Sequence, residues 1–437
     1  MSGDLALIIL LAGFTVLFTL GVPLAFSLLF ASVAVIAIDP SLDLIQVPLK
    51  LFSGINSFLL LSIPGFLFAA LMMNRVGITE DIVKISDLLV GRVKGGLAHI
   101  NVVSSMLMGG VSGSSTADVA GIGAILIPAM NKKGYDRGFS AALTAASSSI
   151  GSIIPPSILM VIYGAAANVS IGALFIAGYI PGILVGLSQL ALCCYYAHKH
   201  GIDLGSPSGF GRGEKLRILA RGLVPISVIG VIIGGILSGV MTATESAAIA
   251  SIYVVLVGLF FYRAVNLRLL LDVAIETALL TSVVMICVGT ATLFGWLMSF
   301  YGVLDASGQL IQVYAGSPVA FLMFAVVLFL VLGTFMDPAP AMLIFVPVLA
   351  QIAPGVGVDP LHLGVLIIMS LAIGKITPPY GISLMLACVI AEIPLSRSLK
   401  WTIVFFTAFC ALMLLIIFVP SIVISLPAYL SPELVGR

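Results

Sequence analysis

The sequence predicts an all-α, polytopic membrane protein, and three observations carry that prediction. Of the 437 residues, 61% are hydrophobic and only 8% are charged, whereas about 25% of the residues of a soluble domain are charged. The mean hydropathy is +1.26. The apolar runs are long and continuous rather than alternating, which favours helices over a transmembrane β-barrel. This composition excludes a water-soluble enzyme, a nucleic-acid-binding protein and a disordered chain.

The first apolar stretches separate into spans by their length. A helix needs about 20 apolar residues to cross a hydrocarbon core of about 30 Å. Residues 5–38 are too many for one helix and are interrupted by Gly21-Val22-Pro23, so we expect two short spans joined by a tight turn. Residues 55–73 form the third predicted span.

Residues 97–130 have a different pattern, with two apolar arms of about 14 residues around a polar tip at 110–118. As a helix, each arm would extend only about 21 Å. We therefore expect a re-entrant hairpin here instead of two full spans. Residues 139–166 follow as a helix that is broken at Pro155-Pro156, because proline lacks a backbone N–H and cannot continue a helix normally.

The second half of the chain repeats this organisation after a set of ordinary spans. Those spans are predicted at 172–197, 223–240, 245–262 and 273–299, with a polar loop at 198–222 and with Glu245 capping the third of them. A second hairpin with short arms is predicted at 318–353 around a polar tip at 333–338, then a helix broken at Pro378-Pro379 within 361–390, and a last span at 401–426.

The distribution of Lys and Arg predicts the topology, because cytoplasmic segments are enriched in positive charge. Of the 19 Lys and Arg residues, 16 lie in the segments 74–96, 131–138, 198–222, 263–272 and 391–400. None lies in 165–171, 299–317 or 354–361. Placing the first set inside and the second set outside makes every span alternate. Both termini are then outside, the first hairpin enters from the cytoplasm, and the second enters from the outside.

The opposite orientation of the two hairpins predicts an inverted repeat. The sequence Gly151-Ser-Ile-Ile-Pro-Pro156 matches Gly374-Lys-Ile-Thr-Pro-Pro379 at an offset of 223 residues, and the same offset relates Gly110 to Gly333. In hydrocarbon, irregular backbone persists only where it lines a cavity, and paired helix breaks are typical of the substrate and ion sites of secondary transporters. The alternative is that the proline pairs only kink packed helices, but their duplication favours a transporter.

The tips and breaks hold the candidate site residues. The first tip and the break beside it offer the hydroxyls of Ser112, Ser114, Ser115, Thr116, Ser147, Ser148, Ser149 and Ser152, with Gly113 allowing close approach. Hydroxyl oxygens suit Na+ and can hydrogen-bond a carboxylate, although helix packing is an alternative role for such small residues. Asp118, Asp337 and Lys375 are charges within membrane segments, which are costly and usually functional. Asp337 is the stronger candidate for a cation ligand, because capping or structural pairing would also explain Asp118.

At these residues the chain resembles the large membrane subunit of tripartite ATP-independent periplasmic (TRAP) transporters, along essentially its whole length. The motifs that carry the resemblance are G-V-P-x-A-F at 21–26, G-x-S-G-S-S-x-A-D at 110–118, I-P-P-S at 154–157, the tip that begins at Gly333, and I-T-P-P-x-G at 376–381. The resemblance implies an elevator-type fold, in which a scaffold carries a transport domain that moves the substrate across the membrane. The implied division is a scaffold and subunit-docking region at 1–96, transport repeats at 97–170 and 317–390, scaffold spans at 171–316, and a C-terminal span at 391–437.

The resemblance also implies Na+-coupled uptake of an organic acid anion, such as a C4-dicarboxylate or sialic acid, across the bacterial inner membrane, and no enzymatic activity. Two Na+ sites are expected, with Ser114, Ser115, Gly151 and Pro155 at the first and Gly333, Thr334, Asp337, Gly374 and Thr377 at the second. The residues expected to contact the substrate are Ser112, Gly113, Thr116, Ser149, Ser157, Asp337 and Lys375. The implied partners are a small four-helix membrane subunit, a periplasmic substrate-binding protein and the lipid bilayer.

Lys375 departs from the family pattern, because an uncharged residue is expected beside the second cation site. One hypothesis is that its ammonium group pairs with Asp337 or replaces one Na+. The alternative is that its long side chain reaches away from the site.

Three other functions stay open from the sequence. A stand-alone Na+/dicarboxylate symporter of the same architecture would need no partner subunits. An intramembrane serine protease would use Ser112 of a G-x-S-G motif, with His362 as the only candidate base in a distant segment. A passive channel would conduct without saturating and has no need of the duplicated breaks.

Overall fold

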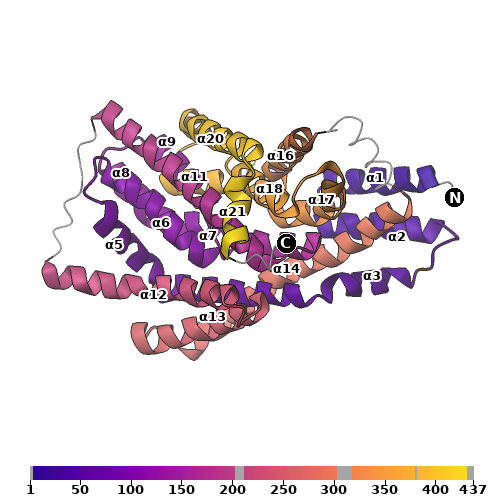
Figure 1. The fold of residues 1–437 in the computed structure, drawn as a ribbon, viewed down its shortest axis with the longest axis horizontal. Coiled ribbons are helices and arrows are strands. Elements are labelled where there is room, and N and C mark those ends of the chain that lie inside the picture. Colours follow the sequence, from indigo (N-terminus) through magenta and orange to yellow (C-terminus); the bar gives the residue numbers. More distant parts are fainter. Residues whose placement is uncertain (1–2, 202–210, 303–316, 379–380, 431–437) are drawn as a thin grey trace.

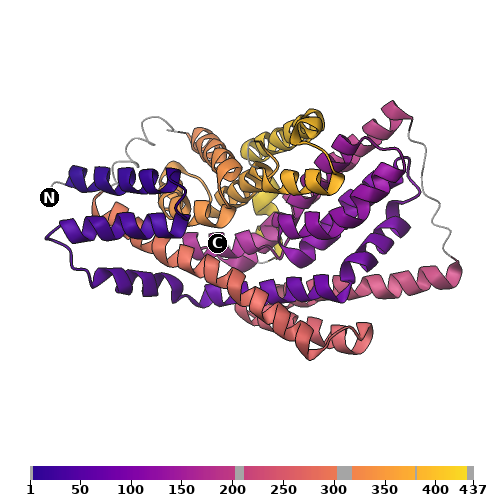
Figure 2. The ribbon, with the colours of Figure 1, turned by 180° about the vertical axis from the view of Figure 1, so that it is seen from behind.

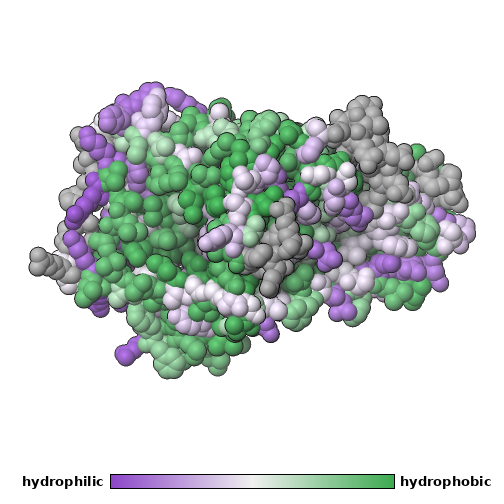
Figure 3. Space-filling model, in the orientation of Figure 1, coloured by the Kyte–Doolittle hydropathy of each residue, from purple (hydrophilic) through white to green (hydrophobic). Residues whose placement is uncertain are grey.

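The computed structural model describes residues 3–201, 211–302, 317–378 and 381–430, and within them the regular structure is helical throughout. The predicted all-α fold is confirmed. Eight helical segments in these ranges are long and apolar enough to cross a membrane. Many of the long helices run along the longest axis of the molecule (Figure 1). On the face shown in Figure 3, hydrophilic residues gather towards both ends of that axis, and hydrophobic residues cover much of the surface between them.

The N-terminal helices form the predicted hairpin. Helices α1 (Gly3–Thr19) and α2 (Leu24–Ile38) pack against each other and are joined by a turn in which Gly21 has a φ of +85°. That backbone conformation favours glycine because it lacks a Cβ. Figures 1 and 2 show α1 and α2 side by side at one end of the molecule, with α3 (Gln46–Ile55) along them.

Two short amphipathic helices lie outside the sequence-based prediction. Helix α3 precedes the third span, and α5 (Ile78–Val90) occupies part of the predicted inner segment at 74–96. Their polar faces lower the average hydropathy, so a search for long apolar runs passes over them. The third span itself is confirmed as a short 3-10 turn, η1 (Phe58–Leu61), that continues into α4 (Ser62–Val76).

The first repeat contains the predicted hairpin and broken helix. The arms of the hairpin are α6 (Gly96–Ser112) on one side and, on the other, α7 (Ser115–Asp118), the π-helical turn η2 (Val119–Gly123) and α8 (Ala124–Lys132). The broken helix consists of α9 (Arg137–Ser148), the 3-10 turn η3 (Ser149–Ser152) and α10 (Ile158–Ala167). Pro155-Pro156 lies in the non-helical stretch between η3 and α10, as predicted.

The second repeat has the same order of elements. Its hairpin is α16 (Pro318–Phe335) and α17 (Pro338–Ile352), the turn η5 (Ala353–Val356) follows, and its broken helix is α18 (Pro360–Gly374) and α19 (Ile382–Ala391). Pro379, the second proline of the predicted break, lies outside the described residues. Helix α16 has 18 residues and is therefore about 27 Å long, which exceeds the short arm that the sequence predicts. The interpretation as a re-entrant hairpin thus depends on the polar tip and not on the length of the arms.

Within the described residues, four helices lie between the two repeats. They are α11 (Ile171–His200), α12 (Arg212–Leu237), α13 (Ala243–Val257) with the π-helical turn η4 (Gly258–Tyr262), and α14 (Leu267–Phe300). Helices α11 and α12 extend into the predicted loop at 198–222, and residues 202–210 of that loop and 303–316 of the predicted outer segment are not among the described residues. The predicted cap is confirmed, because the Glu245 carboxylate accepts a hydrogen bond from the Thr242 backbone N–H at 2.7 Å.

The prediction of a single last span at 401–426 is wrong. Helix α20 (Leu395–Phe418) ends before Pro420, and a separate helix, α21 (Ser421–Leu430), packs against α11. A proline disfavours the helical conformation of the residue before it, and Val419 accordingly has φ −125° and ψ 75°. The predicted outer position of the C-terminus therefore does not follow from a simple alternation of spans, and residues 431–437 lie outside the described part of the chain.

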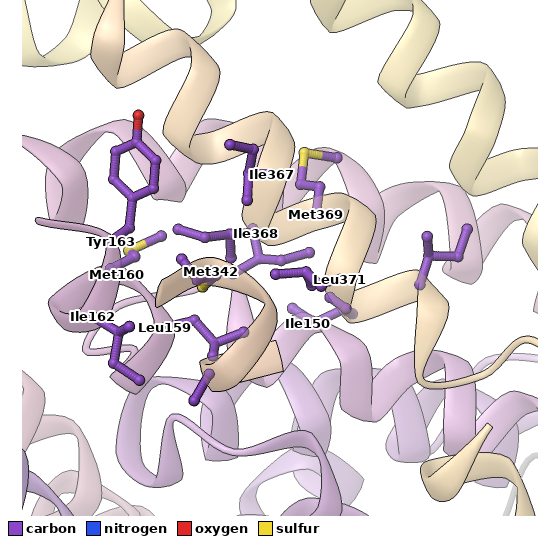
Figure 4. Close-up of a cluster of buried hydrophobic side chains, with 14 of the residues drawn as sticks. Ile150, Leu159, Met160, Ile162, Tyr163, Met342, Ile367, Ile368, Met369 and Leu371 are labelled. Atoms are coloured by element: carbon purple, nitrogen blue, oxygen red, sulfur yellow. The ribbon is translucent and has the colours of Figure 1, made fainter. Parts of the chain in front are cut away.

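The two repeats interlock through their broken helices. Helix α10 of the first repeat packs against α17 of the second, and α19 of the second packs against α9 and α7 of the first. Figure 4 shows side chains from α10, α17 and α18 in one buried cluster. The Tyr163 hydroxyl within it donates a hydrogen bond to the carbonyl of Pro360 at 2.7 Å. This arrangement brings the tips of both hairpins towards the same region.

Candidate functional site

Each hairpin contacts the broken helix of its own repeat through a pair of glycines. A Cβ added to Gly109 would lie 2.7 Å from the Cα of Gly151, and a Cβ added to Gly374 would lie 2.7 Å from the Cα of Gly333. Only glycine permits so close an approach of two backbones. The first of these contacts uses Gly109, one residue before the Gly110 that the offset of 223 relates to Gly333.

The first tip is a dense network of hydroxyl groups. Gly113 ends α6 with a φ of +60°, and the chain then turns into α7. The Ser114 and Thr116 hydroxyls lie 3.2 Å apart, and the Ser115 hydroxyl lies 2.6 Å from that of Ser152 in the break. The tip and the break of the first repeat therefore meet through oxygen atoms, as the sequence predicts.

Asp118 is a fully buried carboxylate behind this tip. One carboxylate oxygen accepts a hydrogen bond from the Ser112 hydroxyl, and the other has no hydrogen-bond partner among the described residues. That second oxygen lies against Gly151, where an added Cβ would collide with it. A buried carboxylate oxygen without a partner is costly unless the group is protonated or meets a cation.

The second tip presents Asp337 at the start of α17. The Asp337 carboxylate caps this helix by accepting a hydrogen bond from the Ala339 backbone N–H at 3.1 Å. Lys375 follows α18 directly and is only 9% exposed, within electrostatic reach of Asp337 and Asp118. The break of the second repeat therefore carries a buried positive charge close to carboxylates from both repeats.

A cavity of about 450 Å³ lies between the two tips and the helices α4 and α14. Its polar lining consists of Asn74, Ser112, Ser114, Thr116, Ser152, Glu276, Asp337 and Lys375, and Gly113 also lines it. Apolar residues of α4, α10 and α14 complete it. A concave, mostly apolar site with a few convergent polar groups is typical of small-molecule binding.

The structure places most of the predicted substrate residues in this cavity, but not all of them. Ser149 and Ser157 do not line it, because both are buried in the break, where their hydroxyls donate to the carbonyls of Ala145 at 3.3 Å and Ser152 at 2.6 Å. Asn74 and Glu276 line the cavity but are absent from the predicted set. Glu276 forms an ion pair with Arg75 at 2.9 Å, so that its charge is already balanced.

The residues expected to hold Na+ offer oxygen atoms in both repeats. In the first repeat, a Cβ built on Gly110 of the hairpin would lie 3.5 Å from the Pro155 carbonyl oxygen, and the Ser115 and Ser152 hydroxyls lie 2.6 Å apart. In the second, the Thr334 and Thr377 hydroxyls donate to the carbonyls of Val331 and Ile373 at 2.7 Å and 2.8 Å, which leaves oxygen lone pairs free. Hydroxyl, carbonyl and carboxylate oxygens of this kind suit a hard cation such as Na+.

A comparison with known protein families identifies the family of the chain. The model for the DctM component of the tripartite ATP-independent periplasmic transporters matches residues 11–422. The chain belongs to this TRAP transporter family. The resemblance inferred from the motifs at the tips and breaks is thereby confirmed.

Individual relatives of this TRAP permease agree with the family assignment. The large permease protein SiaM of a sialic acid TRAP transporter from Vibrio cholerae is 36% identical over 86% of this chain and 87% of its own length. The large permease protein DctM of a C4-dicarboxylate TRAP transporter from Pseudomonas aeruginosa is 32% identical over 88% of this chain and 89% of its own length. Among solved structures, the YdaH transporter from Alcanivorax borkumensis has a TM-score of 0.57 and 17% identity over 87% of this chain and 90% of that chain, which concerns the fold alone.

As a TRAP large permease, the chain is a transporter subunit and not an enzyme. It is a multi-pass protein of the inner membrane, and the family implies a periplasmic binding protein and usually a small membrane subunit. The structure also gives Ser112 no histidine base, since His362 lies 3.0 Å from the carbonyl of Ile416 and no histidine lines the described cavity. Neither the family assignment nor the positions of the histidines therefore supports the protease hypothesis.

Proposed function

We propose that this TRAP permease takes up a small organic anion together with Na+, and that the anion binds in the cavity between the tips. One observation carries the proposal: Ser112, Thr116, Asp337 and Lys375 come from both repeats and line a single cavity with α4 and α14. In a secondary transporter such a convergence of two broken repeats is the expected place for substrate and ions.

The charges around the cavity explain why cations would accompany the anion. Asp118 and Asp337 contribute two negative charges when ionised, and Lys375 contributes one positive charge. A carboxylate can therefore bind with favourable energy only if further positive charge enters with it. The two groups of oxygen atoms behind the tips are the positions that we assign to Na+. The anion itself would be held by Lys375 and by hydroxyls of the first tip.

The substrate class follows from the same chemistry and from the relatives. Sialic acid and C4-dicarboxylates, which the names of two relatives specify, are carboxylates. A carboxylate fits a cavity that offers one ammonium group and several hydroxyl donors. We propose that a periplasmic binding protein delivers this carboxylate, that a small four-helix membrane subunit completes the permease, and that the two repeats move against the scaffold in an elevator-type motion.

Reconstituted uptake tests this proposal. The chain is combined with the small subunit and the binding protein of its own system in liposomes, and uptake of labelled sialic acid and succinate is measured under an inward Na+ gradient and under a matched K+ gradient. Saturable uptake that requires Na+ supports the proposal. Uptake by the chain without either partner would instead identify a stand-alone symporter, and unsaturable flux would identify a channel.

A hydroxyl variant locates the site. Replacing Thr116 by Val removes a cavity hydroxyl at nearly constant volume, and one hydrogen bond to a charged ligand contributes about 1.5–3 kcal/mol. We therefore expect the uptake efficiency, kcat/KM, to fall about ten- to a hundredfold. Thr407→Val is the matched control, because Thr407 is exposed on α20 and bonds only to the Ile403 carbonyl of its own helix. Equal effects of both variants would contradict the proposed position of the site.

A further inference from the structure

A second cavity, of about 440 Å³, lies along the last turns of α14. It is enclosed by α3 and α14 on one side and by α10 and α17 on the other, and it shares no lining residue with the cavity between the tips. Figure 1 shows α3, α14 and α17 together at the N-terminal end of the molecule. The predicted topology places this end outside, because the adjoining segments 165–171 and 299–317 carry no Lys or Arg.

Among the described residues, Lys50 is the only charged one that lines this cavity. Its ammonium group lies 4.8 Å from the centre of the Trp296 ring. No carboxylate of the described residues lies within ion-pair distance of it. The cavity between the tips is different, because there Lys375 is accompanied by Asp337.

The remaining polar lining is neutral and partly unengaged. Within the described part of the chain, the side chains of Ser57, Ser299 and Gln351 make no hydrogen bond. These groups can reorient to donate hydrogen bonds to an oxygen atom. An ammonium group with neutral donors and no competing acid is the composition expected for an anion site.

We propose that this outer cavity binds the carboxylate group of an organic anion, with Lys50 as the charged partner and Trp296 as the wall that positions the ammonium. The proposal deepens the proposed function, since the anion would be the transported one, held here before it reaches the tips. Because no acid of the described residues lines the outer cavity, binding here should not require Na+. Binding between the tips, where acids outnumber the cation, should require it.

Tryptophan fluorescence offers a direct test, because the chain contains only two tryptophans, Trp296 and Trp401. A Trp401→Phe variant leaves Trp296 as the single reporter. The purified chain is placed in nanodiscs of zwitterionic lipid without Na+ and titrated with succinate. We expect a saturable change in Trp296 fluorescence. In the same background, Lys50→Gln should weaken the apparent affinity about tenfold or more, whereas Lys50→Arg, which keeps a positive charge and N–H donors, should weaken it less.

The chain also supplies a matched control. A Trp296→Phe variant leaves Trp401, whose ring has the ammonium of Lys400 at 5.4 Å but does not line the cavity. This variant should show no response to succinate. The proposal is overturned if Trp401 responds like Trp296, if Lys50→Gln leaves the response unchanged, or if only an added anionic lipid such as phosphatidylglycerol changes the signal. Because this assay uses neither Na+ nor the partner subunits, its failure would leave the uptake proposal intact, and failed uptake would leave this result standing.

Discussion

Lys375 places a positive charge where α18 ends, and helix C-termini carry a partial negative charge that favours cations. The carboxylates of Asp337 and Asp118 lie within electrostatic reach of the ammonium group. We therefore interpret Lys375 as a fixed cation whose ammonium group neutralises negative charge that one Na+ would otherwise neutralise.

This interpretation predicts the behaviour of Lys375→Leu. Removal of the ammonium leaves negative charge that a Na+ can neutralise, so the Na+ dependence of uptake should become steeper, with the Hill coefficient rising by about one. Lys375→Arg keeps the charge and should keep the original steepness. The measurement is the initial rate of uptake as a function of Na+ concentration. Substantial uptake by the leucine variant with unchanged steepness would rule out the interpretation.

At the scale of single residues, the sequence identifies the polar tips but not every contact that their side chains make. Asp118 was the weaker candidate, because its sequence position just after the tip is equally compatible with helix capping. The structure instead buries it, and one oxygen has no partner in the described residues. Ser149 and Ser157 were predicted to bind substrate, but a local sequence cannot show that their hydroxyls turn to backbone carbonyls of the break.

At the scale of elements, the glycine pair between α16 and α18 makes a sharp prediction. A Cβ on residue 374 would lie 2.7 Å from the backbone of Gly333, and backbone atoms cannot move aside as a flexible side chain can. Gly374→Ala should therefore destabilise the protein by about 1–3 kcal/mol, the usual cost of overpacking. Thermal unfolding of the detergent-solubilised chain measures this change.

The matched control for this substitution is Gly230→Ala in the interior of α12. Nothing lies within 4 Å of a Cβ built on Gly230, and alanine is favoured over glycine in a helix by up to about 1 kcal/mol. The control should leave the unfolding temperature unchanged or raise it. Equal losses in both variants would mean that the close contact between the two elements does not exist.

The elements that the sequence predicted well are those with a strong local signal. Long apolar runs, Gly21 in the first turn and the two proline pairs each fix a conformation through their own chemistry. The amphipathic helices α3 and α5 depend on the surface that covers their apolar faces, which a hydropathy pattern does not reveal. The hydropathy pattern does not reveal the helix break at Pro420, because apolar residues continue on both sides of it and the composition resembles that of a single span.

At the scale of the whole molecule, the two cavities lie along one helix. The cavity between the tips touches α14 from Glu276 to Val284, and the outer cavity touches it from Val288 to Ser299. From Leu280 to Thr292 the helix rises by about 18 Å. Suppose that α14 belongs to a fixed scaffold and that the two repeats carry the substrate. A displacement of the repeats by this distance would then bring the tips to the level of the outer cavity.

This geometry predicts a measurable change in distance between the scaffold and the second repeat. Spin labels at Leu279 of α14 and Val389 of α19 occupy exposed positions, and so does a label at Leu61 of η1. After replacement of the five native cysteines, the distance from residue 279 to residue 389 should shift when Na+ and succinate are added in the presence of the partner subunits. The distance from residue 279 to residue 61 should stay constant, because η1 continues into α4, and α4 packs against α14. The change in the distance between residues 279 and 389 should not exceed the spacing of the two cavities, which is about 18 Å along α14. Such a change would mean that both anion sites lie on one transport path. Constant distances in both pairs during active uptake would mean that the substrate passes between the cavities without movement of the repeats.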